Sequence, residues 1–173
     1  MRFHFVCSVL ALGVGQAIAE PDLNGLATLR HFDATLTGAG VPVAQVEASS
    51  PGWEANPAAM GANACHMTWT CSGGSATNFP NALGGESGHA NDVGRLFFSV
   101  APGATRLENY EASYFASSIV PNQVPIAAKI VNQSFTYFAR NTRVDREYDH
   151  YAARYNVLFV SGAGNGGWVC SPS

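Results

Sequence analysis

Charged residues are scarce in this sequence. Asp, Glu, Lys and Arg make up 12% of the 173 residues, about half of the ~25% that is usual in soluble domains. The net charge at pH 7 is −3 and Lys and Arg form no cluster, so we expect neither nucleic acid nor an anionic membrane as a partner. Internal repeats, heptads and low-complexity tails are also missing, and the length predicts one domain.

Long apolar runs are missing except at the N-terminus. Arg2 precedes the apolar run Phe5 to Val14, and Ala17-Ile18-Ala19 has the small residues of a cleavage site. The run is too short to favour a membrane span. We therefore predict that residues 1–19 are a signal peptide, that residues 20–173 form the exported domain, and that the protein is secreted. The alternative is a buried N-terminal strand or helix.

Cysteine is also sparse. Cys7 lies within the predicted signal peptide, which leaves Cys65, Cys71 and Cys170. Cys65 and Cys71 are close enough in sequence to staple a loop, so we expect a disulfide between them and an unpaired Cys170. A metal site that includes His66 is disfavoured, because one pair of cysteines with no second pair is a poor zinc pattern.

The rest of the chain alternates between strand and helix patterns. The expected strands are 41–46, 105–110, 127–134 and 157–160, and the expected helices are 90–98, 111–119 and 143–155, after an amphipathic segment at 20–37. The last strand reads as buried, and Val93, Leu96 and Phe97 are expected to face inward. Residues 50–85 are rich in glycine and proline and read as one loop, whose length implies that it is functional, that the cysteines staple it, or that this assignment is wrong. Such alternation predicts an α/β fold with a mostly parallel sheet.

Three polar residues stand where such a sheet presents its binding site. Glu47 follows a strand, His89 precedes a helix, and Asn165 lies among glycines after the last strand. Taken singly, each is an ordinary strand-end, helix-start or turn residue. Together they are three parts of a serine-hydrolase site: a carboxylate to orient an imidazole, an imidazole to act as general base, and an amide to bind an oxyanion.

Four segments in order resemble the subtilases, the subtilisin-like serine peptidases. The segments are Thr37–Val41 with the strand after it, Gly88–Gly94 followed by Val100–Ala104, Lys129–Phe135 and Asn156–Gly167. The resemblance implies a three-layer α/β fold with helices on both faces of the sheet, and a serine-type endopeptidase that hydrolyses extracellular protein. It assigns Glu47 as the orienting group, His89 as the base and Asn165 as the oxyanion donor.

The resemblance also implies a substrate cleft for a polypeptide. Ser134, Phe135 and Thr136 match the edge segment that pairs with an extended peptide. Gly162, Ala163 and Gly164 match the wall of the pocket for the residue before the cleaved bond. No cofactor is expected, a structural calcium ion fits the family but is not evident here, and a monomer is expected.

The sequence departs from the family pattern at the catalytic residues. Glu47 stands where the family has Asp, and His89-Ala90-Asn91-Asp92 replaces its His-Gly-Thr-His. The Gly-Thr-Ser segment of the nucleophile is absent, and Ser171 and Ser173 lie too close to Asn165 to replace it. We therefore expect a partial, C-terminally truncated domain whose nucleophile lies beyond residue 173 and which is inactive alone.

Three other interpretations are open. Gly162, Gly164 and Gly167 spell a dinucleotide fingerprint, although neither the required helix nor an acidic residue follows. Ser87 lies in a sequence like a nucleophile elbow, which would favour an esterase. The third is a non-catalytic subtilase-like remnant or binding domain.

Overall fold

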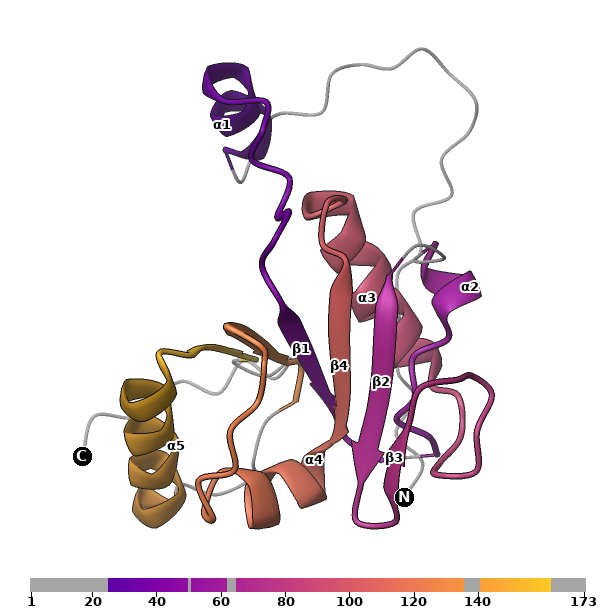
Figure 1. Ribbon diagram of the computed structural model, residues 1–173, viewed down its shortest axis with the longest axis vertical. Helices are drawn as coiled ribbons and strands as arrows, with labels where there is room; N and C mark the ends of the chain where they lie inside the picture. Colours follow the sequence, from indigo (N-terminus) through magenta and orange to yellow (C-terminus); the bar gives the residue numbers. More distant parts are fainter. Residues whose placement is uncertain (1–24, 50, 62–64, 136–140, 163–173) are drawn as a thin grey trace, which may run out of the picture. The chain divides into compact units, whose positions relative to one another are not determined.

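The computed structural model describes residues 25–49, 51–61, 65–135 and 141–162 (Figure 1). It divides into two compact units, residues 1–34 and 35–173. The described part of the first unit contains α1 (Leu26–Phe32), a short helix with no buried side chain. The predicted signal peptide lies outside the described residues.

The described part of the second unit is built on a six-stranded sheet. Its strands are β1 (Val43–Glu47), β2 (His66–Cys71), β3 (Gly74–Ala76), β4 (Arg106–Glu111), β5 (Ile130–Gln133) and β6 (Leu158–Ser161). Their order in space is β3-β2-β4-β1-β5-β6. Only β3 runs antiparallel to its neighbour, and the other pairs are parallel. The α/β class and the mostly parallel sheet are confirmed.

Helices pack on both faces of this sheet. They are α2 (Pro57–Met60), α3 (Gly88–Val100), α4 (Ala112–Tyr114) with the π-helical turn η1 (Phe115–Ile119), and α5 (Thr142–Tyr155). Side chains alternate along β1, so Val43 joins a buried cluster with Ala90 of α3, whereas Ala44 joins one with Tyr151 of α5. The result is three layers, with α3 and α5 on opposite faces of the sheet.

The prediction of one long loop over residues 50–85 is wrong. This segment contains α2, β2 and β3, and its two ends meet where the backbone N–H groups of Trp53 and Glu54 donate to the carbonyl of Gly85. The signal for β2 was present in the sequence, since Met67, Trp69 and Cys71 alternate with polar residues and are buried. The surrounding glycines and prolines obscured it.

The predicted disulfide between Cys65 and Cys71 is also wrong, because both thiols are free. Cys65 directly precedes β2 and Cys71 ends it. Six residues of extended strand span about 20 Å at ~3.3 Å per residue. A disulfide requires Cα atoms within about 7 Å of each other, so the strand that carries the two cysteines holds them apart.

Two expectations about burial also fail. The last strand was expected to be buried, but β6 lies at an edge of the described sheet, and Leu158 and Val160 are 59% and 47% exposed. Leu96 was expected to face inward from α3 and is exposed as well. An apolar run does not by itself distinguish a central strand from an edge strand, because burial depends on neighbours that lie elsewhere in the sequence.

Substitution of Gly52 tests the contact between the ends of segment 50–85. A Cβ atom at Gly52 would lie 2.3 Å from the carbonyl oxygen of Gly85, which is backbone and has little freedom to move. We expect Gly52→Ala to lower the free energy of unfolding by about 2–3 kcal/mol in urea denaturation. Gly85→Ala is the matched control, because its Cβ would meet nothing closer than 4.0 Å, and we expect it to change stability by less than about 1 kcal/mol. Equal effects of the two substitutions would contradict this account.

Candidate active site

Glu47 is the last residue of β1, a central strand of the sheet. β1 lies between β4 and β5, and parallel strands present their carboxyl ends at one edge, where open α/β sheets bind ligands. The Glu47 side chain is only 4% exposed. Because the strand is covered on both faces, a carboxylate has been brought into a largely apolar layer.

His89 reaches this carboxylate from the first turn of α3. The helix begins at Gly88 because the Ser87 hydroxyl caps it, accepting a hydrogen bond from the backbone N–H of Ala90 at 3.2 Å. The cap sets the start of the helix so that Nδ1 of His89 lies 2.7 Å from Oε2 of Glu47. The rest of the imidazole faces outward, and the His89 side chain is 57% exposed.

Gln45, two residues before Glu47 on β1, contacts both the Glu47 carboxylate and the first turn of α3. Its side-chain Nε2 donates to Oε1 of Glu47 at 3.2 Å and to the backbone carbonyl of Ala90 at 2.8 Å. The amide is buried and therefore ties the carboxylate to the first turn of α3. Sequence reasoning missed Gln45, although residues two apart on a strand share a face, and a polar residue two before Glu47 was a usable signal.

The protonation states follow from these contacts. Burial raises the pKa of Glu47, and the hydrogen bond and charge of His89 and the hydrogen bond from Gln45 oppose that rise. An ionised carboxylate can only accept hydrogen bonds, so Nδ1 of His89 carries the proton when Glu47 is charged. Nε2 then has a free lone pair on the exposed side of the ring, which is the state a general base requires.

A second group of predicted residues also comes together. Ser134 and Phe135 follow β5 and Gly162 follows β6, and the backbone N–H of Gly162 donates to the carbonyl of Gln133 at 2.8 Å. A Cβ at Gly162 would lie 3.5 Å from the carbonyl oxygen of Phe135. The two segments thus lie side by side at the carboxyl ends of their strands.

The remaining predicted residues fall outside the described part of the chain. They are Thr136, Ala163, Gly164 and Asn165. The described structure therefore brings Glu47 to His89 and the Ser134–Phe135 segment to Gly162, and it bears on neither the oxyanion donor nor the rest of the pocket wall.

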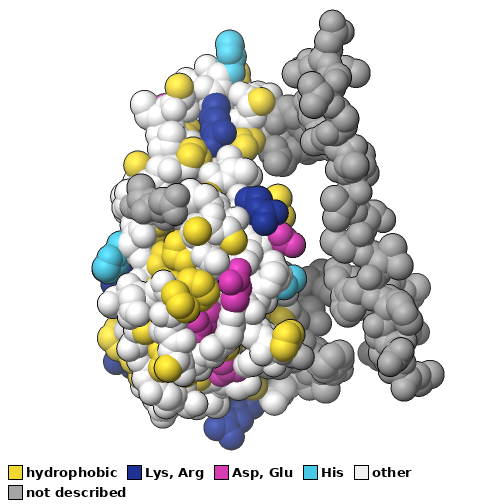
Figure 2. All heavy atoms as spheres, turned by 90° about the vertical axis from the view of Figure 1, so that its right-hand side faces the viewer, with side chains coloured by type: hydrophobic (Ala, Val, Ile, Leu, Met, Phe, Trp, Pro, Cys, Tyr) yellow, Lys and Arg dark blue, Asp and Glu magenta, His cyan; other side chains and the backbone are white. Residues whose placement is uncertain are grey.

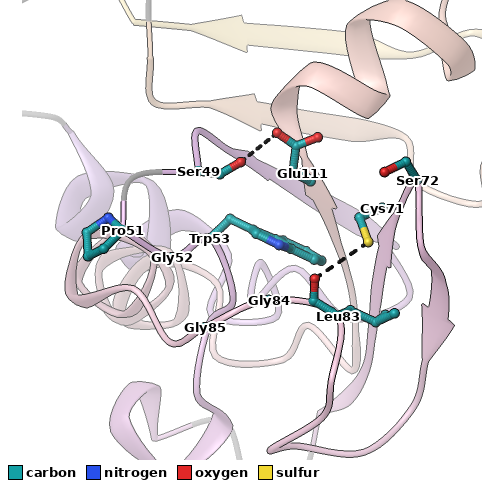
Figure 3. Close-up of a pocket in the computed structure, with 10 residues that line it drawn as sticks. All are labelled: Ser49, Pro51, Gly52, Trp53, Cys71, Ser72, Leu83, Gly84, Gly85 and Glu111. Atoms are coloured by element: carbon teal, nitrogen blue, oxygen red, sulfur yellow. Dashed lines mark hydrogen bonds between the residues drawn. The ribbon is translucent and has the colours of Figure 1, made fainter.

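An open pocket of about 310 Å³ lies at the same edge of the sheet (Figure 3). Its lining residues are Ser49, Pro51, Gly52, Trp53, Cys71, Ser72, Leu83, Gly84, Gly85 and Glu111. Neither Glu47 nor His89 lines it, so the pocket is a neighbour of the imidazole–carboxylate pair and not its cleft. Sequence reasoning did not find this pocket, because most of its walls come from the segment read as a loop.

Other kinds of site find little support in the described residues. Within them, no three His, Cys, Asp or Glu side chains are gathered where they could hold a metal ion. No helix among the same residues has the length and apolar character needed to cross a membrane. The described part of the face in Figure 2 carries only scattered Lys and Arg side chains.

No protein-family model matches the chain, and no curated protein matches it. The function of this chain is therefore inferred from its residues and their geometry.

Replacement of the buried carboxylate should change how stability depends on pH. Because burial raises the pKa of Glu47 above its usual 4.5 in the folded protein, the folded state binds more protons than the unfolded state between those two values. The contribution of Glu47 to stability is therefore fully present below that interval and is lost as pH rises through it.

We accordingly expect Glu47→Gln to gain stability relative to the parent chain as pH rises from about 3.5 to about 7. Urea denaturation at several pH values measures the difference between the two free energies of unfolding. A difference that is independent of pH, or that favours the parent chain increasingly as pH rises, would show that the carboxylate is not held in a charge-disfavouring site.

Proposed function

We propose that this chain carries the acid–base part of a subtilisin-like serine endopeptidase, which hydrolyses peptide bonds of extracellular protein. The observation that carries the proposal is the 2.7 Å contact between the buried Glu47 carboxylate and the exposed His89 ring. A carboxylate followed in the chain by a histidine is the subtilase order. The pair stands at the sheet edge where such folds bind their ligands.

The proposal gives each residue a role. Glu47 would hold the Nδ1–H tautomer of His89 and stabilise the imidazolium that forms during the reaction. Nε2 of His89 would remove the proton of a serine hydroxyl and later give it to the leaving amine. Asn165 would donate to the oxyanion of the tetrahedral intermediate.

The longer Glu in place of the family's Asp does not prevent this arrangement. The carboxylate of Glu47 reaches His89 within hydrogen-bond distance while Gln45 holds its other oxygen. Gln45 also bonds the backbone beside His89, so it would act as a positioning residue that fixes the longer side chain in one rotamer.

A nucleophile is not found among the described residues. Within them, Glu47 is the only residue that bonds the ring nitrogens of His89, so the proposal places the serine in a segment outside that part of the chain. Ser87 is a poor substitute, because its hydroxyl caps α3 and its backbone is extended, with φ −116° and ψ 121°. A nucleophile elbow needs a strained turn with an exposed hydroxyl, so the esterase interpretation loses support.

The same observation favours a second candidate. A domain that kept the Glu47–His89 pair but lost its serine would be a non-catalytic subtilase-like remnant or a binding module. Both candidates share the fold and the pair, so only a test of the chemistry separates them.

The state of the His89 ring is a direct test of the pair. At a pH where the ring is neutral, we expect ¹⁵N nuclear magnetic resonance of the imidazole to show the Nδ1–H tautomer. In Glu47→Gln the new amide oxygen accepts from Gln45 and its NH₂ group faces Nδ1, so the ring should change to the Nε2–H tautomer. Asp92→Asn, which removes another carboxylate on α3, is the control and should leave the tautomer unchanged. The Nε2–H form in the parent chain would rule out the proposed orienting role.

A serine-directed fluorophosphonate tests the nucleophile. We expect no labelling of the 173-residue chain, whereas labelling at Ser87 would make the esterase interpretation the better one. We also expect a Gly-Thr-Ser segment in any coding sequence downstream of Ser173. A chain extended by that segment should cleave casein, and His89→Ala should reduce the rate at least 10²-fold. An extended chain that folds but neither reacts with the probe nor cleaves casein would favour the remnant.

A further inference from the structure

The pocket beside the catalytic pair has a distinct polar end and apolar end. Figure 3 shows Glu111 and Ser49 on one side and Leu83 on the other, with the Trp53 indole between them. The catalytic scheme uses none of these residues. Resting on the function proposed above, we propose that this pocket binds the side chain of a Lys or Arg residue of the polypeptide substrate.

Glu111 supplies the negative charge. Burial alone would raise the pKa of Glu111, but hydrogen bonds from the Ser49 hydroxyl and from the backbone N–H groups of Tyr114 and Ser113 outweigh it and lower the pKa. The carboxylate is therefore ionised at neutral pH. None of the ion pairs among the described residues involves Glu111, so its charge has no cationic partner there.

Hydrogen bonds hold the Glu111 carboxylate in place, because Glu111 is the N-cap of α4. Oε1 accepts from the Ser49 hydroxyl at 2.7 Å and from the N–H of Ser113 at 3.0 Å, and Oε2 accepts from the N–H of Tyr114 at 2.7 Å. The Ser113 side chain is a further hydrogen-bond partner. All of these partners are neutral, so the carboxylate is fixed in position while its negative charge remains available to an ammonium or guanidinium group.

The apolar end suits the stem of a basic side chain. The side chains of Trp53, Leu83 and Cys71 line it, and long basic side chains lay their methylenes along apolar surfaces with the charge at a polar rim. Gly84 lets the chain pass close to the Trp53 ring, because a Cβ there would lie 2.3 Å from Nε1 of Trp53.

The position of the pocket favours a polypeptide as the ligand. Glu111 pairs in register with Glu47, one strand spacing of about 4.8 Å away, and Ser49 follows Glu47 by two residues. Ser134 and Gly162 lie at the ends of β5 and β6, on the other side of β1. A chain extended across the strand ends would meet these residues, then His89, then the pocket. The volume of about 310 Å³ is at the low end of ligand pockets, which begin near ~300 Å³, and suits one side chain better than a large cofactor.

Peptide titration of the 173-residue chain tests the proposal. The probes are blocked pentapeptides Ala-Ala-X-Ala-Ala in which X is lysine, norleucine or glutamate, and the observed signal is the ¹H–¹⁵N resonance of the Trp53 indole. We expect the lysine peptide to bind about fivefold more tightly than the norleucine peptide, as one partly exposed ion pair allows. The glutamate peptide should bind most weakly. The preference for lysine should shrink at high ionic strength.

Variants test whether the Glu111 carboxylate is the charge that binds the lysine side chain. Glu111→Gln should abolish the preference for lysine over norleucine, Glu111→Asp should retain part of it, and Glu147→Gln, which removes an acid on α5, should leave it intact. If Glu111→Gln fails to fold, the salt dependence in the parent chain is the test: a lysine preference that shrinks at high ionic strength supports the proposal, and one that does not shrink contradicts it. Equal affinities for lysine and norleucine, no shift at Trp53, or n-butylamine binding as tightly as the lysine peptide would each overturn the proposal.

The test also separates this proposal from the peptidase proposal. If the chain binds lysine selectively but its His89 ring is in the Nε2–H form, the proposal for the pocket stands and the peptidase proposal fails. If the His89 ring is in the Nδ1–H form but the chain does not prefer lysine, the role of the Glu47–His89 pair stands and the proposal for the pocket fails. His89→Ala should leave the lysine preference unchanged, because His89 does not line the pocket.

Discussion

The burial of one carboxylate at the end of a central strand constrains the rest of this structure. A charged group in an apolar layer is costly unless it is paired and hydrogen-bonded. Here Gln45 and His89 each satisfy one oxygen of Glu47, and both bring α3 with them. The contacts of Glu47 and Gln45 thus tie the first turn of α3 and the His89 ring to the end of β1, while the Ser87 cap sets the start of the helix.

The raised pKa of Glu47 supports the proposal that this residue belongs to a functional site. The pKa of Glu47 remains raised despite both partners. The hydrogen bonds therefore do not fully offset the desolvation cost of the charged carboxylate. Proteins that keep such unfavourable groups commonly do so at functional sites, where stability is exchanged for reactivity. A purely structural strand end would be served equally well by an apolar residue, which needs neither Gln45 nor the exposed ring of His89.

Local patterns predicted some parts of the molecule and not others. β1, β4, α3 and α5 were found near their observed positions, and the meeting of Glu47 with His89 was predicted, because periodicity and strand-end placement are local signals. β2 was not predicted, because glycines and prolines surround it, although its apolar residues alternate with polar ones. The exposure of β6, the separation of Cys65 from Cys71, the role of Gln45 and the pocket depend on contacts between distant segments, which one sequence does not display.

The order of the strands connects the separate features into one surface. From β2 to β6, the carboxyl edge presents first the pocket, then the Glu47–His89 pair, then the Ser134–Phe135 and Gly162 segments. Neighbouring strands are about 4.8 Å apart, and an extended chain rises about 3.3 Å per residue. The distance from β4 to β6 therefore corresponds to roughly four residues of an extended chain. A short polypeptide is the simplest ligand that could contact all three features at once, whereas a small molecule of the pocket's size would reach only one of them.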